Sequence, residues 1–248
     1  MNVLILGANG QLGPYVVKAL EGKHTLRLTD VNGLDETPHE YVRVDVSDID
    51  AVADAAEGMD AIINLSVLRW DPRLAFDVNA RGCYNAMSAA VKHGIRRVIN
   101  TGPHYCIAGL AYERFDYDLK PDVPPQPGTN LYGLTKSLGQ EICRIFTEQH
   151  DVYALTLLFY NFKGSDDGSD FGQDLTPFNV SWMDAGEAFG PALEVDLATL
   201  PSKCEVFNIF TDLPHGKFSN EKAKRLLGWQ PTDNLETYWT RSGEAGSQ

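Results

Sequence analysis

The fold is decided by the stretch Val3-Leu4-Ile5-Leu6-Gly7-Ala8-Asn9-Gly10-Gln11-Leu12-Gly13. A short apolar run leads straight into a turn with three glycines, and an amphipathic helical pattern follows at Leu12–Leu20. Between a strand and a helix, Gly7 allows a tight turn, Gly10 lets the backbone approach a pyrophosphate, and Gly13 permits close helix packing. The helix N-terminus adds N–H groups and a positive partial charge. We therefore predict that this turn binds a dinucleotide through Gly7, Asn9, Gly10, Gln11, Leu12 and Gly13.

The rest of the chain alternates short apolar runs with longer helical patterns. Strands are predicted at Val3–Leu6, Thr25–Thr29, Tyr41–Val44, Ala61–Leu65, Arg97–Thr101, Tyr153–Phe159 and Val206–Ile209. Helices are predicted at Leu12–Leu20, Ile49–Ala56, Arg73–Lys92, Leu131–His150, Met183–Leu197 and Asn220–Leu227. Because the strands are apolar throughout, we expect both faces of a parallel sheet to be buried under crossover helices. The predicted fold class is α/β: a Rossmann-type doubly wound parallel sheet with a small C-terminal substrate-binding subdomain.

The domain organisation follows from this alternation. We predict a dinucleotide-binding Rossmann core over residues 1–160, a small substrate-binding region over 161–241 that is interleaved with the last core elements, and a tail over 242–248. Two irregular stretches, Asp116–Asn130 with its prolines and Lys163–Thr176 with its Gly, Asp and Ser residues, are predicted to be loops near the ligand crevice. The second contains a group of carboxylates, Asp166, Asp167, Asp170 and Asp174, whose spacing matches no calcium loop. No metal site is predicted.

Charge and composition narrow the class of partner. The formal net charge of −13 argues against nucleic acid, because phosphate backbones require clustered Lys and Arg. The sequence has no apolar run of about 18 residues that would span a membrane, and its start lacks a basic leader. Its cysteines (Cys83, Cys106, Cys143 and Cys204) are far apart without a CxxC spacing, which is typical of reduced thiols. We expect a cytoplasmic protein whose partner is a small molecule.

Two acidic residues at predicted strand ends bear on the choice of dinucleotide. Asp30 ends the second strand, where a carboxylate accepts hydrogen bonds from ribose hydroxyls and repels a 2′-phosphate. No arginine follows it closely, so NAD is favoured over NADP. Asp45 ends the third strand and can meet the adenine amino group. Ser47 or Asp48 is expected to cap the next helix.

These residues resemble a known family, the extended short-chain dehydrogenases, which includes NAD-dependent epimerases, dehydratases and the compact uronate dehydrogenases. The resemblance is carried by the glycine turn, Asp45-Val46, Asn64-Leu65-Ser66, Asn79-Ala80-Arg81-Gly82-Cys83-Tyr84-Asn85, Tyr132-Gly133-Leu134-Thr135-Lys136 and Leu226-Leu227-Gly228-Trp229-Gln230-Pro231. It implies cofactor contacts at Asp45, Val46, Leu65, Ser66, Asn79, Tyr132, Lys136 and Tyr160, and substrate contacts at Asn161, His104 and Lys163. It also implies a homodimer formed through the long helices at Arg73–Lys92 and Leu131–His150.

Tyr132 and Lys136 are the predicted catalytic pair. Residues four apart share one face of a helix, so both side chains can reach one site. A phenol with a pKa near 10 is a weak base at neutral pH, and a neighbouring ammonium is expected to lower that pKa. The resemblance implies that Lys136 also binds the nicotinamide ribose.

A third catalytic position departs from the family pattern. The family usually has Ser or Thr after the fifth strand, where this chain has Gly102 or Pro103. Thr101 is the nearest hydroxyl, and His104 can donate a hydrogen bond instead. The loss of one oxyanion-type donor raises the activation barrier by about 2.7–4 kcal/mol, so we expect another residue to replace the missing hydroxyl. Thr101 and His104 are the two predicted substitutes.

The cations expected in a substrate site are scarce in the second half of the chain. No arginine lies between Arg144 and Arg225, and Leu158 occupies a position where relatives often have Arg. A diphosphate-bearing substrate is therefore disfavoured, because Arg is the usual phosphate clamp. Candidate cations are Lys163, Lys203 and Lys217. A small, neutral or hydroxyl-rich substrate is expected.

Three functions remain open on this basis. The first is an NAD-dependent oxidoreductase acting on a hydroxyl or carbonyl of a small sugar, sugar acid or polyol. The second is an NAD-dependent sugar (nucleotide) epimerase or dehydratase, in which the cofactor is reduced and reoxidised within one turnover. The third is a catalytically impaired NAD-binding protein.

Overall fold

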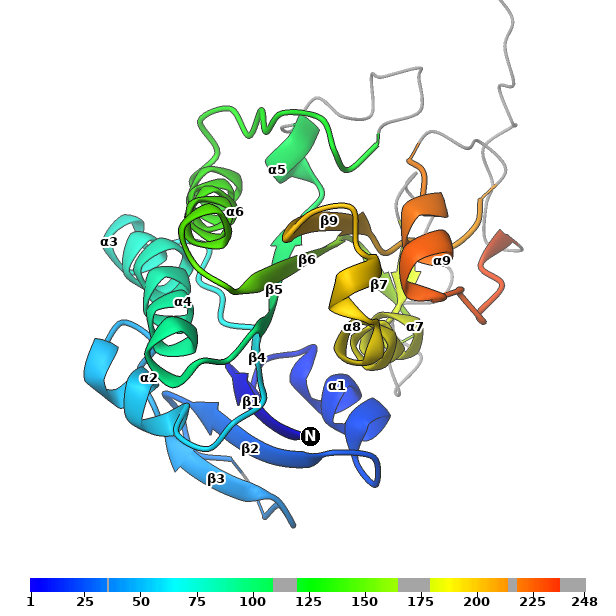
Figure 1. Ribbon diagram of the computed structural model, residues 1–248. Helices are drawn as coiled ribbons and strands as arrows, with labels where there is room; N and C mark the ends of the chain where they lie inside the picture. Colours follow the sequence, from blue (N-terminus) through cyan, green and yellow to red (C-terminus); the bar gives the residue numbers. More distant parts are fainter. Residues whose placement is uncertain (35, 109–119, 165–178, 214–217, 237–248) are drawn as a thin grey trace, which may run out of the picture.

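The computed structural model describes residues 1–34, 36–108, 120–164, 179–213 and 218–236, and its centre is a parallel sheet (Figure 1). The sheet has seven strands in the order β3-β2-β1-β4-β5-β6-β9, and every neighbouring pair is parallel. The strands are β1 (Asn2–Leu6), β2 (Thr25–Asp30), β3 (Glu40–Arg43), β4 (Ala61–Asn64), β5 (Arg97–Pro103), β6 (Tyr153–Phe159) and β9 (Cys204–Asn208). Strand order reverses direction between β1 and β4, as in a doubly wound sheet. The predicted Rossmann-type, doubly wound α/β sheet is confirmed.

Helices cover both faces of the sheet (Figure 1). On one face lie α2 (Ile49–Ala55), α4 (Gly82–His93) and α6 (Leu131–Gln149), and on the other lie α1 (Gly13–Leu20), α7 (Trp182–Glu187), α8 (Phe189–Glu194) and α9 (Glu221–Leu227). Strand β1 explains why both layers form. Val3 and Ile5 pack toward α1 and α8, whereas Leu4 and Leu6 pack toward α2 and α4. Each face of the strand thus buries apolar side chains, which requires a helix layer on each side.

The predicted helix Arg73–Lys92 is present but is divided. It begins as α3 (Pro72–Ala75), continues as a π-helical turn, η1 (Phe76–Arg81), and ends as α4. Asp71 caps its start by accepting a hydrogen bond from Leu74 N at 2.8 Å. π-Helical turns are rare in proteins, but those that occur are often found at functional sites. This turn contains the buried Asn79.

The predicted helix Met183–Leu197 is also divided, into α7, α8 and a 3₁₀ turn, η3 (Leu197–Thr199). Pro191 lies in the first turn of α8, where its missing N–H costs no intrahelical hydrogen bond. Both helices pack on α1 or on the sheet, and β9 forms a sheet edge. Residues beyond 160 therefore complete the core as well as adding the small sheet of β7 (Phe162–Lys163) and β8 (Val180–Ser181).

Several predicted segments lie outside the described residues. These are most of the loop Lys163–Thr176 with its four aspartates, part of the loop Asp116–Asn130, and the tail 242–248. Of the remaining connections, α5 (Tyr105–Ala108) is a single turn after β5. No helix in the described ranges combines the length and apolar character that crossing a bilayer requires.

Asp184 in α7 fastens the C-terminal segment to the core. Its buried carboxylate accepts hydrogen bonds from Thr232 N at 2.8 Å, Thr232 Oγ1 at 2.7 Å and Asp233 N at 3.0 Å. The indole of Trp229 donates to the Asp184 carbonyl at 3.1 Å. A buried carboxylate is tolerated only when it is satisfied in this way.

We predict that Asp184→Ala lowers the free energy of unfolding by about 3 kcal/mol, because it leaves buried N–H and O–H donors without an acceptor. Urea unfolding followed by circular dichroism measures the change. Asp50→Asn, at an exposed position in α2, is the control and should change stability by less than about 0.5 kcal/mol. A small effect of Asp184→Ala would contradict the role assigned to this carboxylate.

Candidate active site

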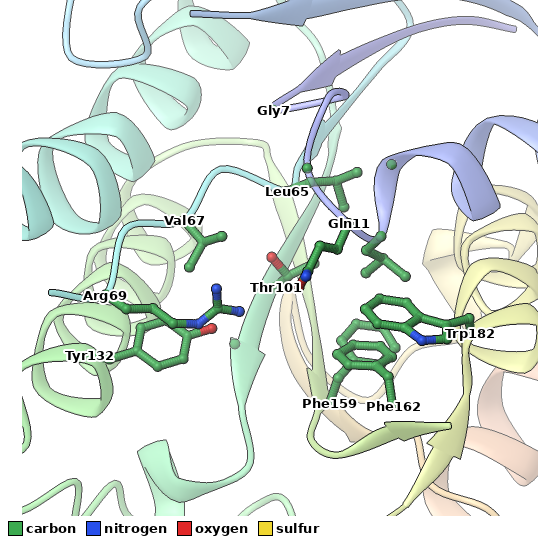
Figure 2. A pocket seen from close by; sticks show the side chains of 14 residues that line it. Gly7, Gln11, Leu65, Val67, Arg69, Thr101, Tyr132, Phe159, Phe162 and Trp182 are labelled. Atoms are coloured by element: carbon green, nitrogen blue, oxygen red, sulfur yellow. The ribbon is translucent and has the colours of Figure 1, made fainter. Parts of the chain in front are cut away.

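A pocket opens beyond the carboxyl ends of β1, β4, β5 and β6, where open α/β sheets bind ligands (Figure 2). It is lined by Gly7, Gly10, Gln11, Leu12, Gly13, Leu65, Val67, Arg69, Thr101, Gly102, Tyr132, Phe159, Phe162 and Trp182. The glycine turn forms one end, Arg69 and Tyr132 form the other, and Thr101 lies between them (Figure 2). The structure thus brings the predicted dinucleotide turn and the predicted catalytic tyrosine into one pocket.

The glycine turn has no room for side chains. Gly7 has a φ of +78°, and a Cβ there would lie 2.9 Å from the Ser66 backbone. A Cβ on Gly13 would lie 1.9 Å from the Ala8 carbonyl oxygen. No side chain in the described ranges caps the N-terminus of α1. Gly13 N donates to Gly10 O at 3.0 Å and Pro14 has no N–H, so the backbone donors that remain for a ligand are those of Gln11 and Leu12 in the turn. The turn therefore fits the pyrophosphate of a dinucleotide.

Asp30 holds the glycine turn in place. Its carboxylate accepts from Asn9 N at 3.1 Å and from Asn32 N at 3.0 Å. The Asn9 side chain donates to Gly33 O at 2.9 Å. Asp30 can offer its remaining lone pairs to a ribose, and this contact stays a prediction.

The end of the third strand has a comparable local network. Asp45 accepts from the Ser47 backbone N at 2.9 Å and from Ser47 Oγ at 2.8 Å, and Asp48 is the residue that caps α2. Val46 is buried against Gly82, and its carbonyl accepts from Asn85 Nδ2 at 2.8 Å. Adenine contacts at Asp45 and Val46 stay predictions.

Lys136 is buried in α6 and reaches under the pocket. Its ammonium donates to the Ser66 carbonyl at 2.8 Å. Burial lowers the pKa of Lys136 to about 8, although nearby cysteine thiols oppose this shift. The helix that carries it begins at Asn130, whose side chain accepts from Gly133 N at 3.0 Å.

Tyr132 has a different cationic partner from the one expected. The Arg69 guanidinium carbon lies 5.1 Å from the centre of the Tyr132 ring, and its positive charge favours the phenolate form, which opposes a rise in the pKa of Tyr132. Burial raises the pKa of Tyr132 to about 12 despite the opposing charge of Arg69. The expectation that Lys136 lowers this pKa is wrong for the free protein, because Lys136 is bound to Ser66 and Arg69 occupies the position beside the phenol.

The two substitutes predicted for the missing hydroxyl lie in different surroundings. Thr101 lines the pocket, and its hydroxyl donates to the Asn64 carbonyl at 2.9 Å, which leaves its oxygen free to accept from a ligand. His104 does not line the pocket. Its ring centre lies 4.6 Å from that of Tyr160, and Phe210 and Phe218 pack at its edges. Burial lowers the pKa of His104 well below its ordinary value, so the ring is neutral.

The residues after β6 are only partly brought to the pocket. Tyr160 faces His104, Asn161 accepts from Val180 N at 3.4 Å, and Lys163 is buried in β7, so none of the three lines the pocket. Phe162 lines it instead and stacks on Trp182 with ring centres 4.1 Å apart. Sequence reasoning missed this aromatic wall, because aromatic residues after a strand are equally typical of a core.

The other candidate cations lie elsewhere. Lys203 binds the His150 carbonyl at 3.1 Å and pairs with Asp151, and Lys217 lies outside the described residues. Sequence reasoning missed Arg69, because a substrate-binding arginine was expected only in the second half of the chain. It lies in the segment that follows the buried strand β4, and a cation in such a segment, at the ligand-binding edge of the sheet, was the available signal.

Asn79 fixes the segment that carries Arg69. Its Oδ1 accepts from Leu68 N at 3.0 Å, and its Nδ2 donates to Leu68 O at 2.6 Å and to Thr135 Oγ1 at 2.9 Å. Both amide hydrogens are thus used within the protein. The predicted contact between Asn79 and the cofactor can therefore be made only through the Oδ1 atom.

Comparisons with known proteins agree with this geometry. NAD-dependent glucose-6-phosphate dehydrogenase of Haloferax volcanii is 24% identical over 98% of this chain and 97% of its own. L-arabinose 1-dehydrogenase (NAD(P)(+)) of the same organism is 24% identical over 95% of this chain and 98% of its own. Among solved structures, a mutant uronate dehydrogenase from Agrobacterium tumefaciens complexed with NAD matches with a TM-score of 0.76 and 24% identity, over 96% of this chain and 86% of that chain.

Residues 3–195 match the model of the NAD dependent epimerase/dehydratase family. This match spans the glycine turn, Tyr132 and Lys136, and the structural match supports the same fold. The predicted family and the predicted cofactor are therefore both confirmed. The chain belongs to the NAD dependent epimerase/dehydratase family, and NAD is its cofactor.

Proposed function

We propose that the protein is an NAD-dependent dehydrogenase that oxidises a hydroxyl group of a small sugar or sugar acid. The observation that carries this proposal is the single pocket in which the glycine turn and the Tyr132 hydroxyl face one another. The names of the relatives support the substrate class, because they include dehydrogenases of a sugar phosphate and a neutral sugar.

The roles of the residues follow from their chemistry. The glycine turn and the start of α1 hold the pyrophosphate, and Phe162 and Trp182 form an apolar wall beside it. NAD, when bound, supplies the hydride acceptor. Tyr132 takes the proton of the substrate hydroxyl at its Oη atom, and Thr101 Oγ1 accepts a hydrogen bond that orients the substrate. Lys136 supports the segment at Ser66 and is the candidate ligand of the nicotinamide ribose.

Removing the phenol tests the proposal. Tyr132→Phe should lower kcat/KM about 10³-fold, because the base is lost, while NAD affinity stays within about threefold. The assay is NADH absorbance with a panel of sugars and sugar acids, and calorimetry gives the NAD affinity.

The wild-type rate of oxidation should rise with pH, because the deprotonated phenol is the base and its pKa in the free protein is about 12.

Tyr153→Phe, at the start of β6 and outside the pocket lining, is the matched control. Substrate conversion without net NADH would favour the epimerase or dehydratase function. Tight NAD binding without turnover of any substrate would favour the impaired cofactor-binding protein.

Thr101 and His104 can be separated as substrate-orienting residues. Thr101→Val should lower kcat/KM about tenfold and Thr101→Ser should retain most of it, because the hydroxyl oxygen accepts one hydrogen bond from the substrate. His104→Phe should have a much smaller effect, since the ring lies among Tyr160, Phe210 and Phe218. The reverse order of effects would assign the role to His104.

We also propose a homodimer in the cytoplasm. The outer surfaces of α3, α4 and α6 expose the large apolar residues Leu74, Tyr84, Leu138 and Ile145, which supports burial against a second copy. The free state of all four cysteines is consistent with a reducing compartment.

The pair of substitutions Leu138→Glu and Ile145→Glu should convert a dimer to a monomer, because charges would be buried at the contact. Light scattering coupled to size-exclusion chromatography measures the mass. Val123→Glu, an exposed apolar residue in the loop before α6, is the control. A monomeric wild-type protein at micromolar concentration would contradict the proposed dimer.

A further inference from the structure

Arg69 is the charged group of the pocket. Among the described residues that line it, Arg69 alone carries a formal charge. Its guanidinium lies above Tyr132, at the end of the pocket away from Gly7 (Figure 2). The pyrophosphate-binding turn and this cation are therefore at opposite ends, and Arg69 borders the space beside the catalytic phenol.

No carboxylate in the part of the chain that the structure describes forms an ion pair with Arg69. The nearby arginines differ in this respect, because Arg73 and Arg81 both pair with Asp77, at 3.8 Å and 3.0 Å. The closest acid along the chain, Asp71, is used to cap α3. Arg69 is exposed at the pocket, so its charge is accessible to a ligand that enters.

The backbone beside Arg69 is held from several sides. Asn79 bonds both the N–H and the carbonyl of Leu68, and the Lys136 ammonium holds the Ser66 carbonyl. Asn64 accepts from Ser66 N at 3.2 Å. These contacts fix the origin of the side chain, which reduces the entropy lost when it binds a ligand.

The guanidinium has donors left for a ligand. It carries five N–H groups in a planar fork, and its contact with Tyr132 is with the face of the ring. These donors match the oxygens of a carboxylate or phosphate, which accept in pairs. A neutral hydroxyl cannot use the charge in the same way.

We propose that Arg69 binds an anionic group, a carboxylate or a phosphate, on the sugar substrate, and that this contact selects acidic sugars over neutral ones. The inference rests on the proposed function and names its substrate class. It replaces the expectation of a neutral substrate, which was based on the absence of arginine between Arg144 and Arg225. That absence is not decisive, because Arg69 enters the pocket from the segment after β4.

The test compares wild type, Arg69→Gln and the matched control Arg73→Gln, an exposed arginine one turn further along the chain. Turnover is measured as NADH formation with D-glucuronate, D-galacturonate, D-glucose 6-phosphate, D-glucose and L-arabinose. Binding of the same sugars to the complex with NADH is measured by calorimetry. The uronates and the sugar phosphate distinguish a carboxylate from a phosphate as the bound group.

Wild type should prefer at least one acidic sugar, and Arg69→Gln should weaken its binding and kcat/KM about 100-fold. Binding of neutral sugars should change by less than about threefold, and their kcat/KM reports the loss that acts through Tyr132 and is common to all substrates. Arg73→Gln should behave as wild type. Equal losses on acidic and neutral sugars would overturn the inference, because Arg69 would then serve only Tyr132. Unchanged binding of acidic sugars by Arg69→Gln would also overturn it.

The two proposals can fail separately. Arg69-dependent binding of an acidic sugar without any NADH formation would support the anion site and contradict the dehydrogenase. Turnover of neutral sugars that is indifferent to Arg69, with no binding of acidic ones, would support the dehydrogenase and overturn the anion site.

Discussion

The contact between Gly7 and Ser66 is the constraint on which the rest of the site depends. A Cβ on Gly7 would lie 2.9 Å from the Ser66 Cα and N atoms, so only glycine allows the two segments to meet. Ser66 in turn accepts the Lys136 ammonium through its carbonyl. Through Ser66, these two contacts fix the relative positions of the glycine turn, the segment after β4 and helix α6. The catalytic tyrosine is placed against the cofactor turn as a consequence.

The segment after β4 has a larger role than its irregular structure suggests. Lys136 and Asn79 come from two helices that face one another, and both use their polar groups on the backbone of this segment. Gly139 allows those helices to approach, because a Cβ there would lie 2.9 Å from the Asn79 carbonyl oxygen. Residues that resemble family motifs thus act here by holding Leu65 and Arg69 at the pocket wall.

The fold and the cofactor turn could be predicted from the sequence because their signals are local. Apolar runs, glycine spacing and the four-residue spacing of Tyr132 and Lys136 are all visible along the chain. The side-chain partners could not be predicted, since they depend on contacts between distant segments. Arg69 and Tyr132 are far apart in sequence, and nothing in the local pattern of either indicates that they meet. The position of His104 among aromatic rings similarly depends on Phe210 and Phe218.

The pKa shifts of the site have one physical cause and bear on the kind of ligand it accepts. Burial raises the pKa of Tyr132 to about 12 and lowers that of Lys136 to about 8, so the surroundings disfavour both an anion and a cation. In such a medium a fixed charge interacts more strongly than it does in water. An acidic ligand loses hydrating water when it enters the pocket, and a positive charge must then compensate its negative charge. Arg69 is the residue of the described pocket lining that can supply this positive charge. Arg69 itself is exposed in the free protein, so water solvates its charge until a ligand enters. An acidic sugar that displaces this water brings its own charge against the guanidinium, whereas a neutral sugar gains nothing comparable from the arginine.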